Sequence, residues 1–209
     1  MKRQITLCLM IVLLCVTFSI AHRKQSGSTP ASNTQTDIRK VDFLNRTYHS
    51  TLCSQEYGRK GIGRIVRVRN GEFKTKTVYF TVASDKIVYA DLTGDGREEA
   101  IVRIDCGATG ANFSRSEVHI YTMQNGVATL LAGTNDKILE RDYRANFRDA
   151  ESYWGINQNG IKTNNGNLAI DVLVDGSHAA PKYIATLEYH LSGRTLSLVG
   201  KPQRKSAGQ

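Results

Sequence analysis

The sequence predicts a mainly β protein built of antiparallel hairpins. Apolar and polar residues alternate with period two through much of residues 65–200, and Asn-Gly or Ser-Gly pairs separate the alternating segments. Alternation is typical of strands with one buried and one solvated face, and such pairs are typical of two-residue hairpin turns. We therefore expect antiparallel sheets with one wet face.

The first expected hairpin turns at Asn70-Gly71. Residues 65–69 place Arg67 and Arg69 on one face and two valines on the other. The return segment, residues 74–82, has apolar residues at alternate positions: Val78, Phe80 and Val82. This pattern predicts two paired strands around the turn.

The later strands follow the same rule. Residues 99–106 place one set on a common face, Ala100, Val102, Ile104 and Cys106, and the other set, Glu99, Ile101, Arg103 and Asp105, on the opposite face. Further hairpins are expected about Asn125-Gly126 and Ser192-Gly193, and residues 168–174 form another alternating strand. His119 and His190 fall opposite their apolar neighbours, so both are expected on solvated faces.

One segment departs from the alternation and predicts a packed helix over about 136–154. Its apolar residues are spaced four, four, three and four apart, as on one helix face: Leu139, Tyr143, Phe147, Ala150 and Trp154. Asn135 or Asp136 could cap its N-terminus, and Gly155 would end it. An ordered loop whose aromatic side chains cover a sheet edge is the alternative.

The first residues have the pattern of a secretory signal peptide. Lys2 and Arg3 precede an unbroken apolar run, and Ser19-Ile20-Ala21 places small residues at the cleavage positions. We expect residues 1–21 to be removed and the protein to be secreted or periplasmic, with no transmembrane helix in the mature chain. An uncleaved N-terminal membrane anchor is the alternative.

Polar stretches rich in small residues flank a single domain. Residues 22–40 are expected to form a flexible linker, and residues 201–209 a basic disordered tail. Residues 41–200 have the size of one β-rich domain with its own core.

Removal of the leader leaves two cysteines, Cys53 and Cys106, in an exported chain. In an oxidising compartment they most simply form one disulfide. A pair of unpaired buried thiols is the alternative.

The stretch DLTGDGREE, residues 91–99, is a candidate calcium loop. The candidate ligands are Asp91, Thr93, Asp95, Arg97 through its backbone carbonyl, and Glu99. Val102 stands where an EF-hand has its bidentate Glu, so a site here would bind Ca²⁺ weakly. A metal-free turn shaped by Asx contacts and glycines is the alternative, and a catalytic carboxylate pair is a third interpretation.

This loop resembles the FG-GAP/VCBS loop of extracellular β-propeller blades, with Thr93 in place of Asn and Glu99 in place of Asp. The likeness covers about residues 87–104, and one copy does not build a propeller. Most of the chain resembles uncharacterised secreted bacterial β-domain proteins through four stretches: VDFLNRTY (41–48), YADLTGDGREEAIV (89–102), DCGATGANFSRSEVHIYT (105–122) and APKYIATLEYHLSGRTLSLVGKP (180–202). This second resemblance implies a shared exported domain and no particular activity.

A basic stretch lies between residues 59 and 76, in a chain whose formal net charge is +9. Its cations are Arg59, Lys60, Arg64, Arg67, Arg69, Lys74 and Lys76. The last five are candidate anion-binding residues, because such a stripe can meet an anionic glycan or lipid surface. The alternative is a solvated strand face that guards a sheet edge. Export and the lack of a stacking platform disfavour nucleic acid.

Enzyme signatures are missing from the sequence: it has no GxSxG, HExxH, P-loop or GxGxxG motif. We therefore expect an exported, non-catalytic binding or interaction module of unknown ligand, stabilised by calcium if the loop binds it. A metal-assisted hydrolase that uses Asp91, Asp95 or Glu99 and a purely structural envelope protein are the alternatives.

Overall fold

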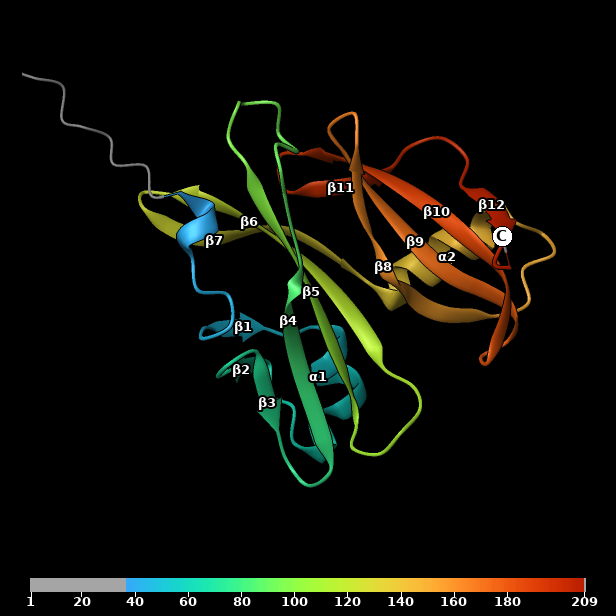
Figure 1. Ribbon diagram of the computed structural model, residues 1–209, viewed down its shortest axis with the longest axis horizontal. Helices are drawn as coiled ribbons and strands as arrows, with labels where there is room; N and C mark the ends of the chain where they lie inside the picture. Colours follow the sequence, from blue (N-terminus) through green and yellow to red (C-terminus); the bar gives the residue numbers. More distant parts are fainter. Residues whose placement is uncertain (1–36, 209) are drawn as a thin grey trace, which may run out of the picture. The chain divides into compact units, whose positions relative to one another are not determined.

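The computed structural model describes residues 37–208, which form two antiparallel sheets of five strands each, a two-stranded ribbon and two α-helices (Figure 1). The strands are β1 (Thr47–His49), β2 (Ile65–Arg67), β3 (Glu72–Lys74), β4 (Val78–Ala90), β5 (Glu99–Ala108), β6 (Arg115–Gln124), β7 (Val127–Asn135), β8 (Tyr153–Asn164), β9 (Asn167–Ser177), β10 (Ala180–Ser192), β11 (Thr195–Leu198) and β12 (Gln203–Ser206). The helices are α1 (Leu52–Tyr57), α2 (Asp136–Asn146) and the 3₁₀ helices Ile38–Lys40 and Gly58–Lys60. The prediction of a mainly β, antiparallel protein is confirmed.

The first sheet has the order β3-β4-β5-β6-β7, and we call it the central sheet. The second sheet has the order β11-β10-β9-β8, with β12 paired beside β10, and β1 pairs only with β2. The β6–β7 hairpin confirms the turn expected at Asn125-Gly126, where positive φ angles of 51° and 78° close a tight turn. The β10–β11 hairpin at Ser192-Gly193 is confirmed as well.

The hairpin expected at Asn70-Gly71 is wrong in its extent. The turn forms, but only one bridge, Arg69 to Glu72, flanks it, because β2 pairs with β1 while β3 pairs with β4. Gly71 lies directly against β4: its carbonyl accepts a hydrogen bond from Val82 N at 2.7 Å. A Cβ at Gly71 would lie 2.4 Å from the Val82 carbonyl oxygen, so a side chain has no room there.

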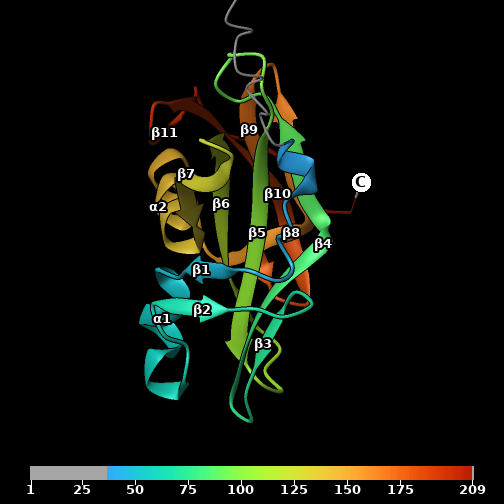
Figure 2. The same ribbon diagram turned by 90° about the vertical axis from the view of Figure 1, so that its left-hand side faces the viewer.

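Both faces of the central sheet are covered, which corrects the expectation of a wet face. We call residues 37–77 the N-terminal segment; it ends with β3, the edge strand of the central sheet. The part before β3 covers one face of the sheet and packs against β5 side chains that include Val102 and Ile104. The other face packs through Ile101 against α2 and the second sheet. In Figure 2 the chain at β1 and β2 crosses in front of β5, and the second sheet lies behind it. Strands buried on both faces lie in the middle of a layered core, and alternation alone does not identify them.

The helix expected over 136–154 is shorter than predicted, since α2 ends at Asn146. Its start agrees with the sequence: the Asn135 side chain accepts hydrogen bonds from the backbone N–H groups of Lys137 and Ile138. After the helix, Asp175 Oδ1 accepts hydrogen bonds from the amides of residues 151 and 152. These contacts hold the chain extended, so Tyr153 and Trp154 begin β8 instead of ending a helix.

The predicted linker and tail are both wrong where the structure describes them. Ile38 is buried at the start of the N-terminal segment, and Arg39 pairs with Glu98 at 2.6 Å. In the predicted tail, β12 pairs with β10, and Arg204 binds Asp175 at 3.0 Å. The predicted signal peptide, 1–21, lies outside the described residues. Within 37–208, no helix is long and apolar enough to cross a membrane.

Candidate functional site

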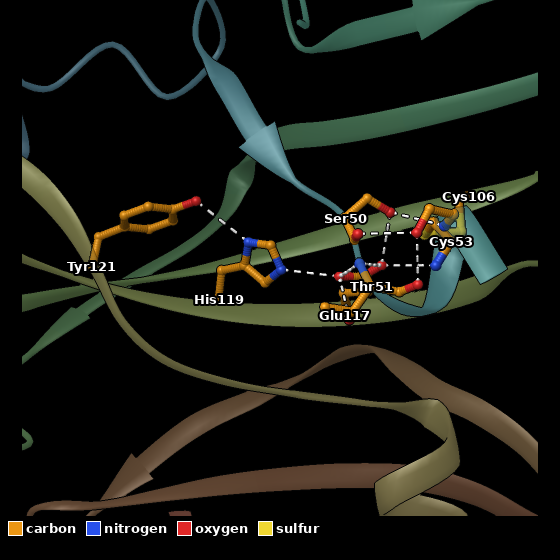
Figure 3. A network of polar contacts seen from close by, with 8 residues as sticks. Ser50, Thr51, Cys53, Cys106, Glu117, His119 and Tyr121 are labelled. Atoms are coloured by element: carbon orange, nitrogen blue, oxygen red, sulfur yellow. Dashed lines mark hydrogen bonds and ion pairs between the residues drawn. A yellow bond between two sulfur atoms is a disulfide. The ribbon is translucent and has the colours of Figure 1, made fainter. Parts of the chain in front are cut away.

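The predicted disulfide between Cys53 and Cys106 is confirmed. It joins α1 to β5 across a sequence separation of 53 residues (Figure 3). Both cysteines are fully buried. The N-terminal segment is thus linked covalently to the middle strand of the central sheet.

A buried carboxylate next to this disulfide holds the same segment by hydrogen bonds. Glu117, on β6, is fully buried and lies at the N-terminus of α1 (Figure 3). Its carboxylate accepts hydrogen bonds from Ser50 Oγ (3.1 Å), Thr51 N (3.0 Å), Thr51 Oγ1 (3.1 Å) and Cys53 N (2.8 Å), and lies 3.0 Å from His119 Nε2. We call this cluster the Glu117 anchor.

The donors of the anchor keep its carboxylate ionised. Burial raises the pKa of Glu117, but hydrogen bonds from His119 and from the Cys53 amide outweigh burial, and the net pKa is lowered. Donors that converge on a buried carboxylate at a helix N-terminus favour its charged form. The anchor therefore binds α1 as an anion.

The structure corrects the prediction for His119, whose side chain is buried at 4 % exposure. Its Nδ1 lies 3.3 Å from the hydroxyl of Tyr121, which is also buried, and burial raises the pKa of that hydroxyl to about 12. A substrate has no access to these buried side chains. His119 therefore serves to position Glu117, to which it is hydrogen-bonded. The signal in the sequence was the spacing of Glu117, His119 and Tyr121 along one face of β6.

The candidate calcium loop forms a compact turn between β4 and β5. Asp91 accepts hydrogen bonds from the amides of Gly94 (2.7 Å) and Gly96 (2.8 Å), and Thr93 Oγ1 donates weakly to it at 3.4 Å. These backbone hydrogen bonds lower the pKa of Asp91, with that of Gly96 as the main cause. The Asx contacts that the sequence allowed are present.

The other candidate ligands point to different partners. The Asp95 carboxylate pairs with the guanidinium of Arg97. Glu99 is fully buried and accepts hydrogen bonds from Leu92 N (2.9 Å) and Thr122 Oγ1 (3.1 Å). Burial raises the pKa of Glu99. Donors of the loop, together with Thr122 of β6, thus bind all three carboxylates, and calcium binding or catalysis by them stays a prediction.

The candidate anion-binding residues are all exposed. They belong to a set that we call the basic surface: Arg59, Lys60, Arg64, Arg67, Arg69, Lys74 and Lys76. A hydrogen bond from Thr77 Oγ1 to the Lys60 carbonyl, at 2.9 Å, joins the 3₁₀ helix Gly58–Lys60 to the β3–β4 turn. Figures 1 and 2 both show α1, β2 and β3 close together. The cations of the basic surface are therefore carried by elements that neighbour one another in the fold.

Few carboxylates face this surface. Within residues 37–208, only Lys74 of the set has an acidic partner, Glu72 at a long 3.9 Å. Residues 37–77 contain ten Lys and Arg against four Asp and Glu, whereas residues 78–208 contain fourteen against fifteen. The positive charge of the described domain thus belongs to the N-terminal segment alone.

Comparisons with known protein families, with curated proteins and with solved structures each find no match to the chain. The two resemblances described above stay predictions.

Proposed function

We propose that the protein is an exported, non-catalytic binding module that takes an anionic polysaccharide on its basic surface. The observation that carries this proposal is the separation of charge, with a formal +6 on residues 37–77 and −1 on residues 78–208. Exposed cations with few acidic partners attract polyanions over about a Debye length, and on binding they displace the counterions condensed on the polyanion.

The attachment of the N-terminal segment supports the proposal. The Cys53–Cys106 disulfide and the Glu117 anchor hold α1 against β5 and β6. Cations carried on a folded backbone lose less backbone entropy on binding than those of a flexible basic tail do. The backbone that carries the basic surface is therefore already ordered before an extended ligand binds.

The side chains of this region favour a soluble polymer over a lipid surface. Ile65, at 65 % exposure, is the one large apolar side chain exposed in the described part of the N-terminal segment. Membrane-surface binding elements combine cations with a broad apolar face, which this region does not have. Anionic vesicles serve as the comparison in the test.

Heparin is a suitable probe, because it is an anionic polysaccharide of high charge density. We expect the full chain to bind heparin at low salt, with affinity that falls about a hundredfold between about 50 and 200 mM salt, as release of counterions from about four contacts predicts. Isothermal titration calorimetry at several salt concentrations measures the slope.

A charge-matched pair of variants tests the location. Arg67→Gln with Arg69→Gln removes two cations from the basic surface, and Lys182→Gln with Lys205→Gln removes two exposed cations from the second sheet. We expect the first pair to weaken binding about tenfold or more and to lower the salt slope by about two, and the second pair to change little. Equal losses in both pairs would contradict a localised surface. Stronger binding to anionic vesicles than to heparin would contradict a polysaccharide as the ligand.

A further inference from the structure

An open hollow of about 370 Å³ lies where three connections of the fold meet. Phe113 precedes β6, Glu151 lies between α2 and β8, and Trp154 lies at the start of β8, beside His178 in the β9–β10 turn. Converging loops held by a rigid scaffold are a common location of ligand sites. None of the residues of the basic surface lines this hollow.

Two aromatic side chains of its lining, Phe113 and Trp154, are packed against His178, which does not itself line the hollow. The ring centroid of His178 lies 5.5 Å from Trp154 and 6.1 Å from Phe113, both in edge-on geometry. Trp154 Nε1 donates a hydrogen bond to the Asp175 carbonyl at 3.3 Å. Both large rings are half-buried, so each keeps part of its surface open to solvent. The hollow therefore presents aromatic surface that is held in place.

Its polar rim has unused donors and acceptors. The guanidinium of Arg115 lies 4.8 Å from the Phe113 ring centroid, and no carboxylate of residues 37–208 lies within ion-pair distance of it. Arg144, on α2, is already bound by Glu140 at 2.9 Å. The carboxylate of Glu151 makes no hydrogen bond within the described residues, since only its backbone does. One free cation and one free anion thus flank the aromatic wall.

We propose that this hollow binds a neutral oligosaccharide, with one pyranose ring packed on Trp154 and its hydroxyls bonded to Arg115 and Glu151. A pyranose ring has an apolar C–H face, and its hydroxyl groups both donate and accept hydrogen bonds. The hollow supplies the complement: aromatic surface, guanidinium donors and carboxylate acceptors.

Two other ligand classes fit the hollow less well. A small anion would be attracted by Arg115 but repelled by the free carboxylate of Glu151, and the Arg144–Glu140 ion pair leaves the lining with no net formal charge. An apolar molecule would remove those charged groups from water without replacing their hydrogen bonds, which is unfavourable. A neutral ligand with many hydroxyls avoids both costs.

The hollow contains its own reporter, because Trp154 is the single tryptophan of the chain. We expect tryptophan emission of the full chain to change saturably with at least one of three probes: cellohexaose, chitohexaose and maltohexaose. Arg115→Gln and Glu151→Gln should each raise the Kd of that probe about tenfold, the usual effect of losing a hydrogen bond to a charged group. Far-UV circular dichroism checks that both variants are folded.

Two controls separate this site from the rest of the molecule. Arg141→Gln removes an exposed cation of α2 that does not line the hollow and should leave the Kd unchanged. Arg67→Gln with Arg69→Gln, which tests the basic surface, should leave it unchanged too. The inference is overturned if no oligosaccharide gives a saturable response, if Arg115→Gln and Glu151→Gln bind like the unaltered chain, or if inorganic phosphate alone saturates the signal.

Discussion

Two buried carboxylates lie at the N-termini of the two α-helices of residues 37–208, and their pKa values are shifted in opposite directions. Glu117, at α1, has five donor groups around it, and its pKa is lowered. Asp136, the first residue of α2, accepts hydrogen bonds only from Tyr153 Oη and Ser116 N, each at 2.7 Å. Burial raises the pKa of Asp136 to about 6.

The number of donors explains this difference. Both carboxylates are fully buried, so each loses its hydration, and only the hydrogen bonds received in exchange favour the ionised form. Glu117 therefore holds the basic N-terminal segment as a stable anion. Asp136 lies beside Tyr153, which lines the hollow, and it changes charge within an accessible pH range.

Removing the disulfide should have the largest effect on stability. It takes away the covalent link that holds α1, and α2 has no such link. Cys53→Ser with Cys106→Ser should lower the free energy of unfolding by roughly 4 kcal/mol, the chain-entropy value for a loop of this length. Urea unfolding of the oxidised chain and of the double variant measures the difference. Reduction of the unaltered chain should reproduce it, and a loss below about 1 kcal/mol would contradict this account.

Amide substitution of each carboxylate compares the two sites directly. Glu117→Gln should cost about 2–3 kcal/mol, because an amide cannot accept from all five donors and leaves buried donors unpaired. Asp136→Asn should cost about 1 kcal/mol or less at neutral pH, because it loses one acceptor and also removes a buried charge. Glu72→Gln, at an exposed carboxylate, is the control and should change little. The reverse order of costs would contradict the donor-count explanation.

The pH dependence of stability should have opposite signs at the two sites. The pKa of Glu117 is lower in the folded than in the unfolded chain, so its contribution is present above about pH 4.5 and is lost as the pH falls through the folded value. The pKa of Asp136 is raised to about 6, so its contribution is present below about pH 3.8 and is lost as the pH rises through 6.

Difference curves isolate each contribution. The stability of the unaltered chain minus that of Glu117→Gln should shrink on acidification below pH 4.5. The same difference for Asp136→Asn should grow as the pH falls from 7 to 4, across the raised pKa of about 6. Curves of the same sign would show that burial alone sets both pKa values.

The smallest expected effect concerns the loop at residues 91–99, which belongs to neither of the two buried carboxylate sites. The calcium hypothesis predicts that millimolar Ca²⁺ raises Tm by about 2–4 °C relative to chelator, as weak binding to the folded state requires. Asp91→Asn should abolish that rise. Superimposed unfolding curves of the unaltered chain would exclude a calcium site at these concentrations.

Local patterns predicted the local structure well. Asn125-Gly126 specifies a tight turn through neighbouring residues alone, and the same holds for the Asn135 cap of α2. The disulfide could be predicted by counting cysteines, because only two remain once residues 1–21 are taken as a leader. Each of these features depends on a few adjacent residues or on residue number.

The remaining features depend on contacts between distant segments. Ser50 and Cys53 donate to Glu117 across 67 and 64 residues of sequence. The residues next to Glu117 in the sequence therefore do not predict these donors. Likewise, residues after Asn146 do not continue the helix that their pattern predicts. Asp175, on β9, accepts hydrogen bonds from two backbone amides just before β8 and holds that segment extended. The basic surface was visible in the sequence, but its isolation from acidic residues needed the fold.

Amide hydrogen exchange of the full chain, with and without heparin, tests the central claim most directly. We expect heparin to slow exchange within residues 59–76, which carry the basic surface, and to leave exchange in the second sheet unchanged. Protection centred on β8 to β12, or uniform protection of the whole chain, would contradict binding at the basic surface.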